Sequence, residues 1–436
     1  MTTHGHRQSP GTEVPPATLG ASAASQITLA ACAAMDSRDS LAHFLDEFLL
    51  PPGVVYLDGN SLGVLPRGAR ERALDVIESE WGNGLIKSWN EAGWWELPVK
   101  LGDKIARLIG ANPGEVIVTD STGLNMYKVM AAALALVPER RVIVMEGSNF
   151  PTDNYMAQGL VAQLGDGYTI RFAEEDELAA AIDDDVAVVC LTQVHYKSGR
   201  VLDMAALTER IHCVGAIAIW DLCHSAGALE VDLNGCNADF AIGCSYKYLN
   251  GGPGSPAFIF AANRHHGIAR QPLTGWWGHA EPFAFERDYR PSHSIRQMLS
   301  GTQPIVSLAL MEVGLDLFLR ADMAAVRAKS QALTSLFIDL VDQRCGPYGI
   351  EVASPRDAHR RGSQVALRHP GGYAIVQALI ARGVVGDFRA PDTLRFGFAP
   401  LYTRYTDVWQ AVESLVQIML SGEWQREEFN RRGMVT

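Results

Sequence analysis

The chain has 436 residues, of which 47% are hydrophobic and 20% charged, and its formal net charge at pH 7 is −12. A chain of this length is too long for one simple core, so we expect two packed domains that fold without metals or disulfides. The negative charge argues against a nucleic-acid or anionic-membrane partner, because the overall field of the chain would attract neither.

The cysteines and the apolar runs indicate the compartment. The seven cysteines form no CxxC pair and several lie in apolar runs, which is typical of a reduced, cytoplasmic protein without a metal site. No run is long and apolar enough to span a bilayer, and residues 1–26 lack the pattern of a signal peptide. The Thr, Ser, Pro and Gly content of residues 1–26 predicts a flexible tail.

Beyond the tail, short runs of β-forming residues alternate with amphipathic runs of helical length. The predicted strands are 115–119, 141–147, 186–194, 216–222, 238–246 and 257–261. Between them, residues 124–137 and 203–215 have apolar side chains at helical spacing. Strands that are apolar on both faces and alternate with helices predict an α/β fold with a mainly parallel sheet covered on both sides. In such a sheet, ligands bind beyond the carboxyl ends of the strands.

The pattern changes after about residue 303. Long amphipathic helical runs follow, and then a shorter α+β segment that contains the runs VALRH, LRFGF and YTDVWQAVESLVQIML. We therefore predict a large domain over residues 27–302, including an N-terminal segment. Residues 303–436 are predicted to form a long linking helix and a small C-terminal domain.

A carboxylate stands at the end of the predicted strand 216–222. Asp221 follows the apolar run AIAIW, and His224 comes one turn later in DLCHSAGA. A buried carboxylate needs a cationic or hydrogen-bonding partner, because an unpaired buried charge is costly. Asp221 is therefore either a ligand-facing carboxylate or the N-cap of a following helix, a position where Asp is also favoured.

A lysine follows the next predicted strand. Lys247 stands between Tyr246 and Tyr248 and precedes the glycine-rich turn GGPG. Such a lysine is either an ordinary surface residue or an amine in a partly apolar pocket, where its neutral form can condense with a carbonyl. An amine of this kind and a strand-end aspartate are the pair that pyridoxal phosphate (PLP) chemistry requires, because the aspartate keeps the pyridine nitrogen protonated.

Three further strand exits carry candidate ligand contacts. In EVIVTDSTGLN, a strand turns at 119–123 into a helix. The free N–H groups and the positive end of that helix could hold a phosphate, or the polar residues before it could simply be an ordinary helix cap. Phe150 in GSNFPTDNY could lie against a planar cofactor or belong to the core. His195 in TQVHYKSGR could contact a ligand or only satisfy its own loop.

Several segments together carry a resemblance to a known family. They are LDGNSLGVLPRG (57–68), GLIKSWNEAGWWELP (84–98), NFPTDNY (149–155), IWDLCHSAGA (219–228), CSYKYLNGGPG (244–254), GWWGH (275–279) and LRFGFAPLY (394–402). On these residues the chain resembles the kynureninase family of PLP-dependent hydrolases. The resemblance covers roughly residues 50 to 420 and implies fold type I, the aminotransferase-like fold with a large PLP-binding domain and a smaller C-terminal α+β domain.

The resemblance implies roles for residues around the cofactor. Lys247 is implied to form the covalent link, Asp221 to pair with the pyridine nitrogen, and Phe150 to stack on the ring. The other residues implied to hold the cofactor are Thr122, Gly123, Pro151, Thr152, Asp153, Thr192, His224 and Tyr246. Trp276 and Thr302 are implied to reach the phosphate end of the neighbouring subunit's cofactor, which would place the active sites at a homodimer interface.

The resemblance also implies a substrate site. Arg395 is implied to clamp the α-carboxylate, a task that suits a bidentate guanidinium. The residues implied to approach the aromatic end of the substrate are Trp89, Asn60 and Ser61, although Trp89 could equally be a tryptophan that packs a lid. His195 is a further candidate substrate contact from its strand exit. The chain departs from the family at Gly123, where Ser or Thr is typical, so we expect looser cofactor binding, by ~1 kcal/mol or about twice that. Asn is common in the family where His195 stands, which leaves the preferred substrate open.

The implied activity is PLP-dependent hydrolysis of the Cβ–Cγ bond of L-kynurenine or 3-hydroxykynurenine in tryptophan catabolism and NAD biosynthesis. The products would be L-alanine with anthranilate or 3-hydroxyanthranilate. Lys247 would take the Cα proton, and Tyr246 would take part in activating the attacking water.

Three alternatives to this activity stay open. The same chemistry could act on a ring-substituted kynurenine in secondary metabolism, or the chain could be a cysteine desulfurase-like lyase with Cys345 as its candidate nucleophile. It could also be a cofactor-free structural or regulatory homologue. Retention of Lys247, Asp221 and Arg395 together argues against the last alternative, because such a homologue would need none of them.

Overall fold

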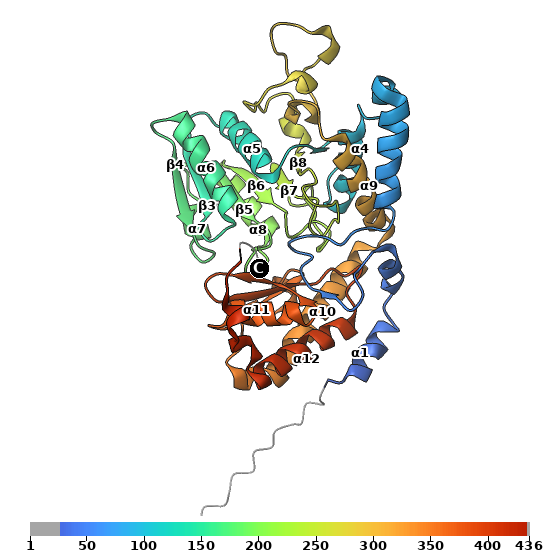
Figure 1. Cartoon of the computed structure of the whole chain (residues 1–436). Coiled ribbons are helices and arrows are strands. Elements are labelled where there is room, and N and C mark those ends of the chain that lie inside the picture. The colour runs from blue at the N-terminus through green and yellow to red at the C-terminus, as the bar shows by residue number, and fades with distance from the viewer. Residues whose placement is uncertain (1–26, 434–436) are drawn as a thin grey trace, which may run out of the picture.

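The computed structural model describes residues 27–433, and the predicted tail at 1–26 lies outside the described residues. Figure 1 shows a larger α/β lobe around a seven-stranded sheet and a smaller lobe that contains the C-terminal helices. Within residues 27–433, no helix is long and apolar enough to cross a membrane.

The large lobe is built on one mixed sheet. Its strands, in their order across the sheet, are β2 (Val116–Val118), β8 (Phe258–Ala261), β7 (Phe240–Gly243), β6 (Ile217–Asp221), β5 (Val186–Thr192), β3 (Val142–Glu146) and β4 (Thr169–Ala173). Neighbouring strands are parallel except that β8 runs antiparallel to both β2 and β7. The predicted, mainly parallel α/β sheet is therefore confirmed. Strand β4 was not predicted from the sequence, because this edge strand is only partly buried and lacks a strong apolar pattern.

Helices cover both faces of this sheet, because alternate strand residues enter two different cores. They are α4 (Leu97–Leu108), α5 (Thr122–Leu136), α6 (Pro151–Leu164), α8 (Met204–Cys213) and α9 (Ile305–Arg320). Ile219 of β6 packs in the core that contains Met126 of α5. The next residue, Trp220, packs on the other side with Ile211 of α8 and donates its Nε1–H to Thr208 Oγ1 at 3.0 Å. Shorter helices are α2 (Ala69–Leu74), α3 (Ser88–Glu91), α7 (Leu178–Ala181) and α13 (Glu427–Asn430).

The small lobe packs helices against a four-stranded antiparallel sheet. Its strands, in their order across the sheet, are β12 (Asp387–Arg389), β13 (Thr393–Gly397), β10 (Gln364–Arg368) and β9 (Glu351–Val352). Its helices are α10 (Met323–Arg344), α11 (Gly372–Ala381) and α12 (Tyr405–Ser421).

The link from the large lobe consists of two helices rather than one. The chain breaks between α9 and α10 at Asp322, whose carboxylate caps α10 by accepting the N–H of Ala324 at 3.0 Å.

The N-terminal segment packs with the small lobe before it reaches the large one. Helix α1 (Leu29–Asp36) lies beside α12, and Asp36 accepts the backbone N–H of Tyr405 at 2.7 Å. Strand β1 (Val55–Tyr56) pairs in parallel with β11 (Val384–Val385). Gly63 then donates its N–H to the Tyr246 carbonyl at 2.8 Å, and a Cβ there would lie 2.4 Å from the Lys247 carbonyl. Glycine therefore lets this segment approach the predicted active site closely.

Candidate active site

A cavity of about 750 Å³ lies beyond the carboxyl ends of the central strands and between the two lobes. The predicted site residues that line it are Asn60, Ser61, Thr122, Gly123, Phe150, Thr152, Asp153, Asp221, His224, Tyr246, Lys247, Thr302 and Arg395. They come from the N-terminal segment, from the loops of the large sheet and from the small lobe. Folding therefore brings together in one cavity residues that are far apart in the sequence.

Lys247 stands beside a histidine inside this cavity. Strand β7 ends at Gly243, so the predicted strand 238–246 is shorter in the structure, and a loop carries the lysine. Lys247 Nζ lies 3.2 Å from His224 Nε2. Burial, and then the positive charge of Lys247, lower the pKa of His224 well below its usual range. The imidazole is therefore neutral near pH 7 and can accept a hydrogen bond from the amine.

Asp221 is the last residue of β6 and lies against a second carboxyl group. Residues 222–229 form no helix, so the alternative that Asp221 caps a helix is wrong; its Oδ1 accepts the N–H of Cys223 at 2.7 Å. Asp153 is buried in the first turn of α6, where Asn149 donates to its Oδ2 at 2.9 Å. Burial, and then the negative charge of Asp221, raise the pKa of Asp153 well above its usual value. This shift favours the protonated form of Asp153, and the pair offers carboxyl oxygens that can accept a hydrogen bond from a protonated ring nitrogen.

The amino end of α5 faces the same cavity. The helix begins at Thr122, two residues before the predicted start, and Ser121 caps it by accepting the N–H of Leu124 at 3.4 Å. Backbone N–H groups in a first helical turn have no partner within the helix, and the helix dipole adds positive potential there. Because Thr122 and Gly123 line the cavity, this end of it suits an anion such as a phosphate.

Phe150 provides an aromatic surface at the start of α6. It is the N-cap residue, its side chain is 44% exposed, and it lines the cavity. Pro151 occupies the first helical position, where its missing N–H is harmless, and does not line the cavity. The ring of Tyr196 meets Phe150 edge-on, with centroids 5.3 Å apart and planes at 83°.

Arg395, in β13, is almost fully committed to protein partners. Its Nε donates to Asp387 Oδ1 at 2.8 Å, and its Nη2 donates to Asp387 Oδ2 and, at 2.8 Å, to Ser61 Oγ. Its Nη1 donates to the Tyr196 carbonyl at 2.6 Å. A guanidinium has five N–H groups, so in this arrangement one hydrogen on Nη1 is left for a ligand. Arg389, which also donates to Asp387 at 2.7 Å, lines the cavity and adds a second positive charge.

Four more of the predicted residues do not line the cavity; they are Thr192, His195, Trp89 and Trp276. Thr192 ends β5 with its hydroxyl bonded to the Val194 carbonyl at 3.3 Å. Trp89 packs in an aromatic cluster with Trp94, Trp95 and Trp277, because large apolar rings bury more surface against one another than against an open cavity. Trp276 stacks on Trp277 and is 37% exposed.

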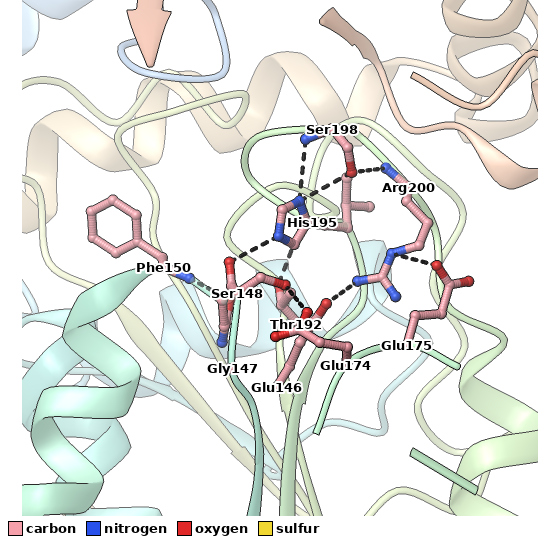
Figure 2. A network of polar contacts seen from close by, with 12 residues as sticks. Glu146, Gly147, Ser148, Phe150, Glu174, Glu175, Thr192, His195, Ser198 and Arg200 are labelled. Carbon is pink, nitrogen blue, oxygen red and sulfur yellow. Dashed lines mark hydrogen bonds and ion pairs between the residues drawn. The ribbon is translucent and has the colours of Figure 1, made fainter. Parts of the chain in front are cut away.

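His195 faces a second cleft of about 570 Å³, lined among others by Glu146, Ser148 and Arg200. Figure 2 shows its ring between two serines: Nε2 lies 2.9 Å from the Ser148 carbonyl, and Nδ1 accepts the N–H of Ser198 at 3.2 Å. Because a carbonyl can only accept, Nε2 carries the hydrogen and the ring is neutral. His195 thus satisfies its own loop, and the structure does not bring it to the cavity as a substrate contact.

The buried, neutral His195 predicts a loss of stability in mild acid. Burial lowers the pKa of His195 from 6.5 to about 4, while Ser148 and Glu174 oppose the shift and Arg200 and Lys197 assist it. The unfolded chain binds this proton first, so stability should fall between pH 6.5 and 4, by about 3 kcal/mol at most. His195→Gln keeps a donor for Ser148 but cannot titrate. We expect wild type to lose more stability than this variant between pH 7.5 and 5 in urea unfolding, and an unchanged difference would contradict the prediction.

Comparison with known proteins identifies the family. A kynureninase of Pseudomonas fluorescens is 55% identical over 410 residues, which cover 93% of this chain and 99% of that protein. A kynureninase of Burkholderia pseudomallei (strain 1106a) is 53% identical over 408 residues, covering 92% and 98%. The chain belongs to the kynureninase family. The model of the kynureninase C-terminal domain matches residues 326–415, which lie in the small lobe.

Solved structures with the same fold include cysteine desulfurases. The apo enzyme from Thermococcus onnurineus NA1 has a TM-score of 0.74 and 17% identity, covering 87% of this chain and 98% of that one. The cysteine desulfurase CsdA from Escherichia coli has a TM-score of 0.72 and 19% identity, covering 88% and 98%. At these identities the likeness shows the fold alone, and it confirms the predicted fold type I.

The cavity residues fit PLP, the cofactor of the kynureninase family. Lys247 would supply an amine for the aldehyde carbon, and Asp221 with Asp153 would supply carboxyl groups for the ring nitrogen. Phe150 offers an aromatic face for the ring, and the amino end of α5 at Thr122 offers N–H groups for the phosphate. The aldehyde, the ring nitrogen and the phosphate of the cofactor therefore each have a group of matching chemistry in the cavity.

The kynureninase fold keeps the cysteine of the desulfurase alternative away from the cavity. Cys345 lies at the carboxyl end of α10 with 0% exposure, and burial raises its pKa to about 12. A nucleophilic cysteine needs an accessible thiol that ionises near neutral pH. Cys345 therefore lacks the properties of a desulfurase nucleophile.

Gly123, the position that departs from the family, leads to a prediction about cofactor affinity. A Cβ there would lie 2.8 Å from Met156 Cε and 3.1 Å from Thr152 Cγ2, so Met156 fills the space that a family serine would need. We expect Gly123→Ser combined with Met156→Ala to bind PLP roughly 5-fold more tightly than Met156→Ala alone, because the added hydroxyl can donate to the phosphate. Titration of the cofactor absorbance measures both affinities. Equal affinities would show that this hydroxyl does not reach the phosphate.

Three further residues line the cavity that were not predicted from the sequence: Arg389, Tyr196 and Met156. Arg389 follows Asp387 on β12, and the pairing of β12 with β13 places Asp387 opposite Arg395. A signal was present in DFRAPDTLRFGF, where a second arginine precedes the predicted one. Only the strand pairing shows that both arginines share one carboxylate.

Proposed function

We propose that this member of the kynureninase family hydrolyses the Cβ–Cγ bond of L-kynurenine or 3-hydroxykynurenine to L-alanine and the corresponding anthranilate. The observation that carries the proposal is the single cavity in which Lys247, Asp221 and Arg395 meet. These groups suit an amino-acid substrate bound to PLP: an amine for the cofactor, a carboxylate for its ring nitrogen and a guanidinium for the α-carboxylate. The identity of 55% to a kynureninase supports the same substrate class.

The chain's own residues move and hold protons around the cofactor. When bound, PLP supplies a protonated ring that draws electrons from the substrate's Cα. We assign to Lys247 the transfer of the Cα proton, because its amine is in the cavity and is freed when the substrate amine takes its place. His224, 3.2 Å from Lys247 Nζ, accepts a hydrogen bond that keeps the amine in place. Asp221 and Asp153 keep the ring nitrogen protonated.

Tyr246 is the proposed proton donor at the substrate's γ-carbonyl oxygen. Burial raises the pKa of Tyr246 far above its usual value, so its phenol holds a proton throughout the physiological range. A phenol in this state donates a hydrogen bond and does not act as the base for water. We therefore assign it to stabilising the oxygen on which charge develops when water adds.

At the substrate end, we propose that Arg395 and Arg389 bind the α-carboxylate together. Arg395 and Arg389 carry one positive charge each, and Asp387, to which both donate, carries one negative charge. The net positive charge of this group attracts an anion such as a carboxylate. We keep Asn60 and Ser61 as substrate-facing residues because both line the cavity, where Ser61 Oγ accepts from Arg395. Trp89 and His195 do not line the cavity, so we assign neither of them a direct substrate contact.

We further propose a homodimer in which Trp276 reaches the partner's cofactor. The loop that follows Trp276, gold at the top of Figure 1, extends from the large lobe and exposes Phe283 (67%) and Phe285 (78%). Clustered exposed aromatics are typical of protein contact surfaces. Thr302 lines the cavity of its own chain. If Thr302 also reaches the partner's cofactor, it must lie at the interface between the two subunits. A monomer in sedimentation equilibrium at micromolar concentration would contradict this arrangement.

We place the protein in the cytoplasm and in tryptophan catabolism leading toward NAD biosynthesis. This proposal is supported by the substrate class and by the free cysteines, five of which are buried.

An assay of the purified protein with PLP decides the activity. Kynurenine and 3-hydroxykynurenine are each supplied, and alanine and the aromatic product are measured together; we expect equal amounts of the two products. The ratio of kcat/KM for the two substrates decides the ring preference. If neither substrate yields alanine while PLP is bound, the proposed function is wrong.

A further inference from the structure

The loop 195–200 contacts both ends of the proposed active site. At one end, the Tyr196 carbonyl accepts hydrogen bonds from Arg395 Nη1 at 2.6 Å and from Gln364 Nε2 at 2.8 Å. At the other end, the Tyr196 ring stands edge-on to the ring of Phe150, with centroids 5.3 Å apart. The main chain of Tyr196 is thus fixed by the small lobe, while its side chain supports a ring that belongs to the large lobe.

The same loop also fixes the backbone that leads to Phe150. His195 Nε2 donates to the Ser148 carbonyl at 2.9 Å, and the Phe150 N–H donates to Asn149 Oδ1 at 2.7 Å. Figure 2 shows that the ring of Phe150 points away from this polar network while its backbone nitrogen belongs to it. The network therefore sets where the Phe150 backbone lies, but it leaves the orientation of the ring to other contacts.

Anchors on both lobes hold the loop itself. Arg200 forms an ion pair with Glu146, the last residue of β3, and their side chains are only 7% and 2% exposed. Ser198 accepts the hydroxyl hydrogen of Ser354 at 2.6 Å through its carbonyl, and Gly199 accepts the N–H of Gly362 at 2.7 Å. A loop held in this way presents the Tyr196 ring from a fixed position.

The Phe150 ring has little other support. It is 44% exposed, and Tyr196 is its one aromatic partner within residues 27–433. The Tyr196 hydroxyl has no hydrogen-bond partner among the same residues, so the ring rather than the hydroxyl makes the observed contact. An edge-on aromatic pair restricts the rotation of both rings and adds to the area that they bury.

We propose that Tyr196 is a positioning residue whose ring holds Phe150 flat against the cofactor ring. The proposal rests on the proposed function, because it requires PLP to lie beneath Phe150. Under this proposal, Tyr196 raises the affinity for PLP indirectly, by holding the Phe150 ring in place.

The test measures PLP affinity, by cofactor absorbance, for apo proteins that carry Tyr196→Leu or Tyr196→Phe. Tyr196→Leu removes the ring and is expected to weaken PLP binding roughly 2- to 10-fold, the range for one aromatic pair. Tyr196→Phe keeps the ring and is expected to bind PLP within about 2-fold of wild type. Thermal unfolding of each apo protein checks its fold, and Tyr196→Met replaces the leucine variant if the latter does not fold.

A double-mutant cycle shows whether the effect passes through Phe150. In a Phe150→Leu background, adding Tyr196→Leu should leave PLP affinity nearly unchanged, because the ring that Tyr196 holds is already absent. Additive losses would overturn the proposal, and so would a Tyr196→Phe protein that binds PLP as weakly as the leucine variant. A failure of the proposed function looks different, since wild type itself would then release no alanine from kynurenine or would not bind PLP.

Discussion

Replacing Lys247 by alanine is expected to lower the rate of alanine release from kynurenine by at least a hundredfold. Lys247 supplies the cavity amine, and removing a proton-transfer group of this kind costs roughly 10²- to 10⁴-fold in rate. The variant should also lose the covalent cofactor link that borohydride fixes in the wild type. Single-turnover kinetics and mass spectrometry after borohydride treatment measure the two effects separately.

Lys247→Arg is the matched control for charge at this position. Arginine keeps a positive charge near His224, but it does not deprotonate and cannot form the link. We expect it to lose both activity and the link as alanine does, while it retains PLP non-covalently. If Lys247→Ala still showed a borohydride-stable link at wild-type stoichiometry, another amine would hold the cofactor and our assignment of Lys247 would be wrong.

Replacing Arg395 by alanine is expected to raise the KM for kynurenine roughly 10- to 100-fold. Hydrogen bonds to a charged group contribute about 1.5 to 3 kcal/mol, and Arg395 is the buried cation at the carboxylate end. Because Arg389 remains, the variant should keep part of the affinity, and Arg389→Ala alone should raise KM by a smaller factor. Steady-state kinetics with kynurenine measures both.

Two controls separate carboxylate binding from folding. Arg395→Ala leaves the buried Asp387 with Arg389 as its remaining cation, which can destabilise the small lobe. Adding Asp387→Ala removes that buried charge, so it should restore stability without restoring KM. The decarboxylated analogue of kynurenine should bind wild type and Arg395→Ala equally. An analogue that distinguishes the two proteins as strongly as kynurenine would show that Arg395 does not act on the carboxylate.

Much of the candidate site could be predicted because it depends on strand ends. Asp221 ends β6 and Lys247 follows β7, and parallel strands bring their carboxyl ends to one edge of a sheet whatever their loops do. The start of α5 at Thr122 follows from the same rule. The apolar pattern of the sequence determines which segments form the strands of the sheet. The residues at the ends of those strands therefore meet in one cavity.

Side-chain direction within loops could not be predicted in the same way. His195 and Tyr196 are adjacent in sequence, yet His195 turns to a second cleft while Tyr196 lines the cavity. Hydrogen bonds to Ser148 and Ser198 make that choice, and neither bond follows from local sequence. Trp89 likewise looked ligand-facing from its motif, but packing against Trp277 decides its place.

The sequence by itself thus determined the mainly parallel α/β class and the order of the strands along the chain, and it placed candidate cofactor groups at strand ends. Those properties follow from hydrophobic periodicity and from residues at strand ends, which are local features. Only the tertiary structure decided that the N-terminal segment joins the small lobe, that Asp387 is shared by two arginines, and that the Tyr196 ring packs edge-on against Phe150. Each of these depends on contacts between residues far apart in the chain, whose geometry is set when the two lobes pack together.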